Sequence, residues 1–106
     1  MANPWAGEVA IGLNGKRQVM KLTLGALAEL ESELGADSLV ALIQRFEDGK
    51  VSSRDVLALL CAGLRGGGWR GAQDDLTSAE IEGGVMAAVA ACGRLLAVSF
   101  AQPEVK

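Results

Sequence analysis

Histidine and tyrosine are absent from this chain of 106 residues, and only 4% of the residues are aromatic. Without histidine, the chain lacks the commonest general base and the commonest metal ligand, and without tyrosine it lacks a phenolic acid. We therefore expect no catalytic residues, no metal site and no cofactor, that is, a protein that is not an enzyme. With so few aromatic rings, the core must consist of Leu, Val, Ile and Ala, which favours closely packed helices.

Long apolar runs and clusters of one charge are also missing. The most apolar uncharged stretch, residues 83–93, is bounded by Glu82 and Arg94, and it is too short for a membrane-spanning helix, which needs about 20 residues. The 10 basic residues are scattered among 13 acidic ones, for a net charge of −3. This charge distribution argues against a phosphate-binding surface. We expect a protein that binds neither a membrane nor nucleic acid.

The chain length and the two cysteines indicate one small cytoplasmic domain, residues 1–106. A chain of this length can bury one core but not two. Cys61 and Cys92 lie in apolar helical patterns and form no Cys-x-x-Cys pair, so we expect them to be reduced core residues. The N-terminus has no basic leader followed by an apolar segment, which also favours a cytoplasmic location.

A β-hairpin is predicted over residues 7–22, with a turn at the Asn-Gly pair of positions 14 and 15. Two pairing registers of the strands are possible. A two-residue turn sets Ile11 opposite Gln18, whereas a four-residue loop over residues 14–17 sets Ile11 opposite Met20 and Val9 opposite Leu22. We prefer the second register because it makes one continuous apolar face.

About four helices are predicted over residues 23–100, which makes the fold α+β and mainly α. Thr23 caps the first helix, which ends at Gly35. Asp37 or Ser38 caps the second, and Ser52 or Ser53 opens the third. The glycines at 66–68 close the third helix, and a loop follows. The capping-box sequence TSAE at 77–80 announces a last helix of about 20 residues, and residues 101–106 form a flexible tail. The apolar stripes are Leu24, Leu27, Leu30 and Leu34; Leu39, Leu42, Ile43 and Phe46; Val56, Leu57, Leu60, Cys61 and Leu64; and Ile81, Val85, Val89, Cys92, Leu96 and Phe100.

One glycine-rich stretch has the form of a ligand-binding motif. Residues 66–71 match Gly-x-Gly-x-x-Gly, but that dinucleotide fingerprint follows a strand and opens a helix, whereas this run closes a helix. Together with the apolar helices, the stretch leaves a small-molecule-binding accessory protein as a second alternative. A thermal shift screen with nucleotides and metals would test that alternative.

Four residues are candidate partner contacts. Trp5 and Trp69 lie beside Pro or Gly outside the predicted helices. Each ring either covers the core or anchors a partner, as aromatic side chains often do at interfaces. Ala87 and Ala91 lie in the small-residue part of the last helix, where we expect a surface for self-association or for a partner. A glutamate at either position should abolish association there, unless the position belongs to the core.

The chain resembles a known family along nearly its whole length, from Gly7 to about Phe100. The resemblance rests on the hairpin, on LTLGALAELE at 22–31, on RFE at 45–47 and on AGLRGGG at 62–68. On these motifs the chain resembles the small gene-transfer-agent proteins that are grouped with phage tail assembly chaperones. The motifs are structural, so the resemblance transfers no catalytic residues.

The resemblance implies a non-enzymatic role in building the tail of a phage-like particle in the bacterial cytoplasm. Chaperones of this class are thought to coat the tape-measure protein until tube subunits polymerise around it. The implied partners are therefore phage-like tail proteins, above all the tape-measure protein. The alternative is a structural tail or connector component that stays in the finished particle.

Overall fold

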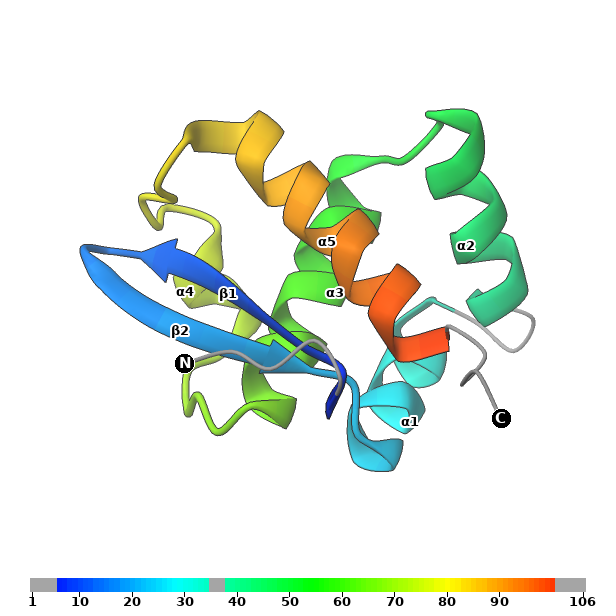
Figure 1. The fold of residues 1–106 in the computed structure, drawn as a ribbon, viewed down its shortest axis with the longest axis horizontal. Helices are drawn as coiled ribbons and strands as arrows, with labels where there is room; N and C mark the ends of the chain where they lie inside the picture. Colours follow the sequence, from blue (N-terminus) through cyan, green and yellow to red (C-terminus); the bar gives the residue numbers. More distant parts are fainter. Residues whose placement is uncertain (1–5, 35–37, 101–106) are drawn as a thin grey trace, which may run out of the picture.

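The fold is an N-terminal β-hairpin followed by helices that pack around one core (Figure 1). The computed structural model describes residues 6–34 and 38–100. Over these residues the architecture is the predicted one, α+β and mainly α. The elements are β1 (Glu8–Leu13), β2 (Lys16–Lys21), α1 (Leu24–Leu34), α2 (Ser38–Asp48), α3 (Ser53–Gly66), α4 (Gln73–Leu76) and α5 (Gly84–Phe100).

Four of these helices correspond to the four predicted ones, and α4 is a short addition within the predicted loop. The central helix is α3, which contacts β2, α1 and α5, while α5 also packs on β1. Trp5, the predicted helix end at Gly35, the possible cap at Asp37 and the tail at 101–106 lie outside the described residues. The largest fully buried side chains are Met20, Leu30, Leu42, Leu59, Leu60, Leu64, Leu95 and Cys92.

The hairpin has the register of the two-residue turn, so the preferred four-residue loop is wrong. Ile11 lies opposite Gln18, and Val9 lies opposite Met20. The φ angles are +51° at Asn14 and +79° at Gly15, as a type I′ turn requires at both of its central residues. Turn geometry therefore outweighs the apolar matching across the strands. One buried face still forms, although half-buried Gln18 interrupts it on β2.

The glycines after residue 65 let α3 approach the backbone of β2. A Cβ atom at Gly66 would overlap the carbonyl oxygen of Lys21, and a Cβ atom at Gly67 would overlap that of Val19. Because these obstacles are backbone atoms, they cannot rotate away as a side chain can. The run that formally matches a dinucleotide fingerprint is thus used for helix-to-sheet packing.

The predicted capping box at 77–80 does not form, and α5 begins at Gly84. The segment before α5 pairs instead with the end of the hairpin. The N–H of Asn14 donates to the carbonyl of Glu80 over 2.7 Å, and the N–H of Glu82 donates to the carbonyl of Gly12 over 3.0 Å. Ile81 forms an isolated β-bridge with Leu13. These distant partners satisfy backbone groups that the helix would otherwise have used, so the local signal is overridden.

The starts of α1 and α3 are as predicted. The hydroxyl oxygen of Thr23 accepts from the N–H of Ala26 over 3.1 Å, and Ser52 is the cap of α3. The stripe of α1 differs from the prediction at its start, because Leu24 is 85% exposed and Ala26 is buried in its place. Both cysteines are free and buried, as expected. Burial raises the pKa of the Cys92 thiol to about 12, which keeps it neutral.

A buried carboxylate ties α2 to α3. Asp55 is 5% exposed and accepts two hydrogen bonds of 2.9 Å from the Arg45 guanidinium. It also accepts from the N–H of Ser52 over 3.0 Å, which completes a capping box. Burial alone would raise the pKa of Asp55, but the hydrogen bonds from Arg45 and Ser52 and the charge of Arg45 lower it below its usual 3.8.

We predict that Asp55→Asn lowers the free energy of unfolding by about 2 kcal/mol at pH 7, because it removes charge-assisted hydrogen bonds and weakens the cap. Since the carboxyl has a depressed pKa in the folded state, its stabilisation is complete above the unfolded pKa of about 3.9. That stabilisation disappears as the pH falls through the folded value. The difference in the free energy of unfolding between wild type and variant, measured by urea unfolding, should therefore be smaller at pH 3 than at pH 6. An equal difference at both pH values would contradict this account.

Candidate partner-binding groove

A hollow with a mostly apolar lining lies between α2 and α5. Helix α2 packs mainly on α1 and is joined to α3 through Arg45 and Asp55, so it stands beside α5 without closing on it (Figure 1). The space between them, here called the α2–α5 groove, has a volume of about 480 Å³. Its lining residues are Ile43, Phe46 and Glu47 from α2 and Val89, Gly93, Leu96 and Ala97 from α5.

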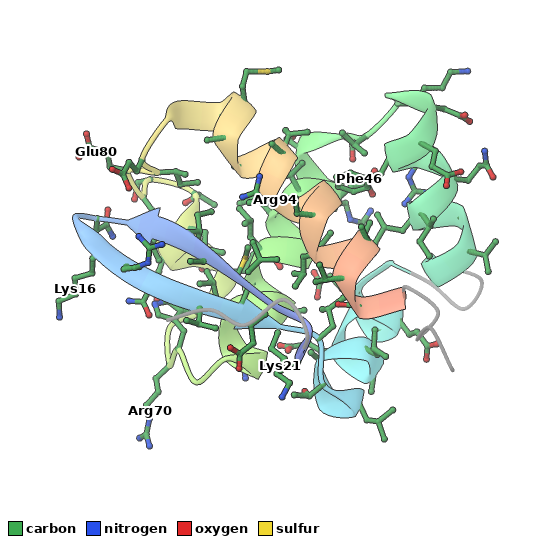
Figure 2. All side chains as sticks on the ribbon, in the orientation of Figure 1. Lys16, Lys21, Phe46, Arg70, Glu80 and Arg94 are labelled. Atoms are coloured by element: carbon green, nitrogen blue, oxygen red, sulfur yellow. The ribbon has the colours of Figure 1, made fainter. Side chains whose placement is uncertain are left out.

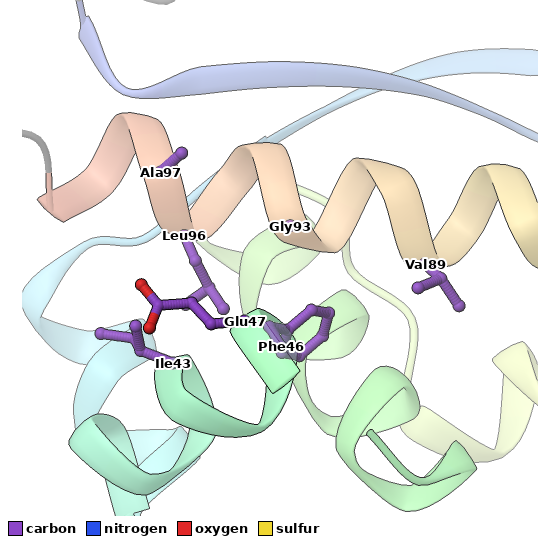
Figure 3. A pocket seen from close by; sticks show the side chains of 7 residues that line it. All are labelled: Ile43, Phe46, Glu47, Val89, Gly93, Leu96 and Ala97. Atoms are coloured by element: carbon purple, nitrogen blue, oxygen red, sulfur yellow. The ribbon is translucent and has the colours of Figure 1, made fainter. Parts of the chain in front are cut away.

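Apolar side chains from both helices face one another across this groove. Figure 3 shows Val89 and Leu96 directed from α5 toward α2, with the ring of Phe46 below them. Ile43 and Phe46 are half-buried, so the domain itself only partly covers them. Glu47 is exposed and is the one charged residue in the lining. The groove thus offers an apolar floor with one acidic group at its edge.

The apolar surface continues beyond the groove along both helices. Val85 precedes Val89 by one turn of α5 and is 76% exposed, and its neighbour Met86 is 77% exposed. On α2, Val40 precedes Ile43 by three positions and is 78% exposed. Residues three or four apart lie on the same helix face. A cluster of exposed apolar side chains of this kind marks an interaction surface more often than isolated ones do.

The candidate contacts on the last helix lie on a different face from the groove. Ala91 is 2% exposed, so its methyl group packs inside the domain. Ala87 is half-buried, and both alanines line a small hollow beside β1 together with Ala10 and Arg94. Their contact with a partner stays a prediction. For Ala91, the structure shows a packing role within the domain.

Trp69 is half-buried and packs against the core. Its indole ring fills the place that a Cβ atom at Gly71 would take. The neighbouring Arg70 points away from the molecule into solvent (Figure 2). Trp69 thus covers the core, and whether it also anchors a partner stays a prediction.

The groove was not predicted from the sequence. Ile43 and Phe46 belong to one predicted apolar stripe and Val85, Val89 and Leu96 to another, but periodicity does not show that these stripes stay partly uncovered. The signal that could have identified the groove is the uncharged face formed by Val85, Val89 and Gly93. Within the described ranges, no cluster of His, Cys, Asp and Glu could hold a metal ion. No helix there is long and apolar enough to cross a membrane.

By its fold and its groove, the protein is a small, mainly helical α+β domain with an apolar groove open on its surface. Residues 6–102 match the protein family described as phage tail tube protein, GTA-gp10. The match covers nearly the whole chain, so the chain belongs to this family of gene-transfer-agent tail proteins, as its sequence motifs predicted. No curated protein and no solved structure gave a significant match.

Proposed function

We propose that this protein is a non-enzymatic tail assembly chaperone that binds the tape-measure protein in the bacterial cytoplasm while the tail of a phage-like particle is built. The observation that carries the proposal is the α2–α5 groove, whose apolar walls are only partly covered by the domain. A tape-measure protein is long and helical, and its apolar stripes aggregate unless they are covered. A groove between two helices suits one such stripe.

A second candidate is a structural component that stays in the finished tail. The description of the family as a tail tube protein favours this candidate. The same groove would then bind a neighbouring subunit permanently. A chaperone leaves its partner before the tail is finished, whereas a structural component stays bound to it. The composition of finished particles therefore separates the two functions.

Mass spectrometry of purified particles, together with co-purification from cells that are assembling tails, tests the proposal. We expect the protein to be absent or far below stoichiometric amounts in particles, and to co-purify with the tape-measure protein during assembly. Stoichiometric presence in particles would support the structural component instead. Failure to co-purify with the tape-measure protein would refute the chaperone function.

The alternative of a small-molecule-binding accessory protein stays a prediction. It rests on the glycine run at 66–71 and on the apolar helices, and Gly66 and Gly67 of that run serve the packing of α3 on β2. The thermal shift screen remains the direct test of that alternative.

A further inference from the structure

Gly93 is a glycine in the interior of α5 that no close contact within the domain requires. A glycine inside a helix costs about 1 kcal/mol relative to alanine, so it needs a reason. Gly63 and Gly66 have one, because a Cβ atom there would collide with neighbouring residues. Gly93 lies in the middle of α5 without a positive φ, and a Cβ atom on it would meet no atom within 4 Å. The domain itself does not explain this glycine.

The position of Gly93 suggests an explanation from outside the domain. It lines the α2–α5 groove between Val89 and Leu96 (Figure 3). Absence of a side chain at this point lets another backbone come close to α5. Side chains at the contact set how closely two packed helices approach one another. A glycine at the centre of the groove therefore fits a partner helix that crosses α5 there.

We propose that the α2–α5 groove binds one amphipathic helix of a partner, with its backbone crossing α5 at Gly93 and basic residues beside its apolar stripe. The claim that this partner is a tail protein rests on the proposed function. The apolar walls, including Phe46 and Val89, require an apolar stripe with side chains at i, i+3 or i+4, and i+7.

The basic flank follows from the charge at the edge of the groove. Glu47 lines the groove, and the neighbouring Asp48 is also exposed. A lysine or arginine beside the apolar stripe would complement these carboxylates, whereas an acidic flank would be repelled. A second copy of this chain is a poor occupant through α1, because that helix carries exposed Glu31 and Glu33. Charge therefore favours a helix with basic residues beside its apolar stripe.

Two designed peptides of about 20 residues, each about 30 Å long when helical, test the inference. Both peptides carry the same leucine stripe with a central alanine. The residues beside the stripe are lysines in one peptide and glutamates in the other. Fluorescence anisotropy should show the wild-type protein binding the lysine peptide at least about tenfold more tightly than the glutamate peptide. Absence of binding to the lysine peptide, or equal affinity for both peptides, would overturn the inference.

Gly93→Leu should fill the groove and weaken binding of the lysine peptide at least about tenfold. Gly25→Leu is the matched control, because Gly25 is an exposed helical glycine of α1 whose Cβ atom would meet only its own cap, Thr23. That control should bind like wild type. Circular dichroism should show both variants folded. Unchanged binding by Gly93→Leu would refute the site.

Glu47→Lys provides a test that cannot fail through misfolding of the core, since Glu47 is exposed. Because Asp48 stays in place, the inference requires the preference for the lysine peptide to become weaker, and an unchanged preference would refute the charge assignment. The proposed function is tested separately by co-purification of the tape-measure protein. If wild type and Gly93→Leu both retain that protein, the chaperone function stands and the groove is wrong. If only wild type retains it, both proposals are supported.

Discussion

Ala91→Glu is expected to unfold the domain at 25 °C. Ala91 is 2% exposed and lies on the side of α5 that faces β1, beside Ala10 and Ile11. A glutamate there must either be desolvated in the narrow hollow that it shares with Arg94 or push α5 off the hairpin. Taking a charge out of water costs several kcal/mol even where an opposite charge is near, which is comparable to the 5–15 kcal/mol that typically stabilise a whole domain. Circular dichroism and urea unfolding measure the effect.

Ala90→Glu is the matched control for this substitution. Ala90 is the preceding residue of the same helix, and it is exposed. The free energy of unfolding of this variant should lie within about 0.5 kcal/mol of wild type. A folded Ala91→Glu variant with a normal unfolding transition would show that the packing of α5 on the hairpin is wrong. It would also restore Ala91 as a candidate surface contact.

Gly67→Ala and Gly93→Ala are expected to change stability in opposite directions. At Gly67 the added methyl group would collide with the carbonyl oxygen of Val19. Relief requires the end of α3 to move away from β2, which should cost about 2–4 kcal/mol. At Gly93 the same methyl group meets open space, so the better helix propensity of alanine should add up to about 1 kcal/mol.

Chemical denaturation of the two variants beside wild type checks this pair. Because the chemical change is identical, the sign of each effect reports only the surroundings of the glycine. A neutral Gly67→Ala variant would mean that α3 does not approach the edge of β2 as closely as described. A destabilised Gly93→Ala variant would mean that the groove is already closed by the domain, and the proposed docking of a partner helix would lose its basis.

Features that depend on a few neighbouring residues could be predicted from the sequence. Thr23 and Ser52 cap their helices through hydrogen bonds to residues three positions ahead, so the signal and its partner lie in one short window. The end of α2 is equally local, because Gly49 has a φ of +71° and donates its N–H to the carbonyl of Phe46. Such contacts need no partner from a distant part of the chain.

Features that depend on distant partners could not be predicted. The capping-box sequence at 77–80 is a valid local signal. However, the backbone of Glu80 is hydrogen-bonded to Asn14, and that of Glu82, just beyond it, to Gly12. The groove was missed for a related reason. Periodicity shows that Val85 and Val89 share an apolar face, but only the position of α2 decides whether the domain covers that face. The hairpin register is the exception, since the Asn-Gly turn was a local signal that deserved more weight than apolar matching.

The pairing of Glu80 with Asn14 has a consequence for the order of events during synthesis. These residues are separated by 66 positions in the chain, and contacts across such a separation require most of the chain to be present. While the protein is being synthesised, the hairpin and the first three helices emerge before residues 80–82 can attach to the hairpin end. We therefore expect the α5 wall of the groove to dock last, after the hairpin and the first three helices have emerged. If the proposed function holds, a nascent chain on the ribosome would lack the groove, and binding of a partner would begin only after release.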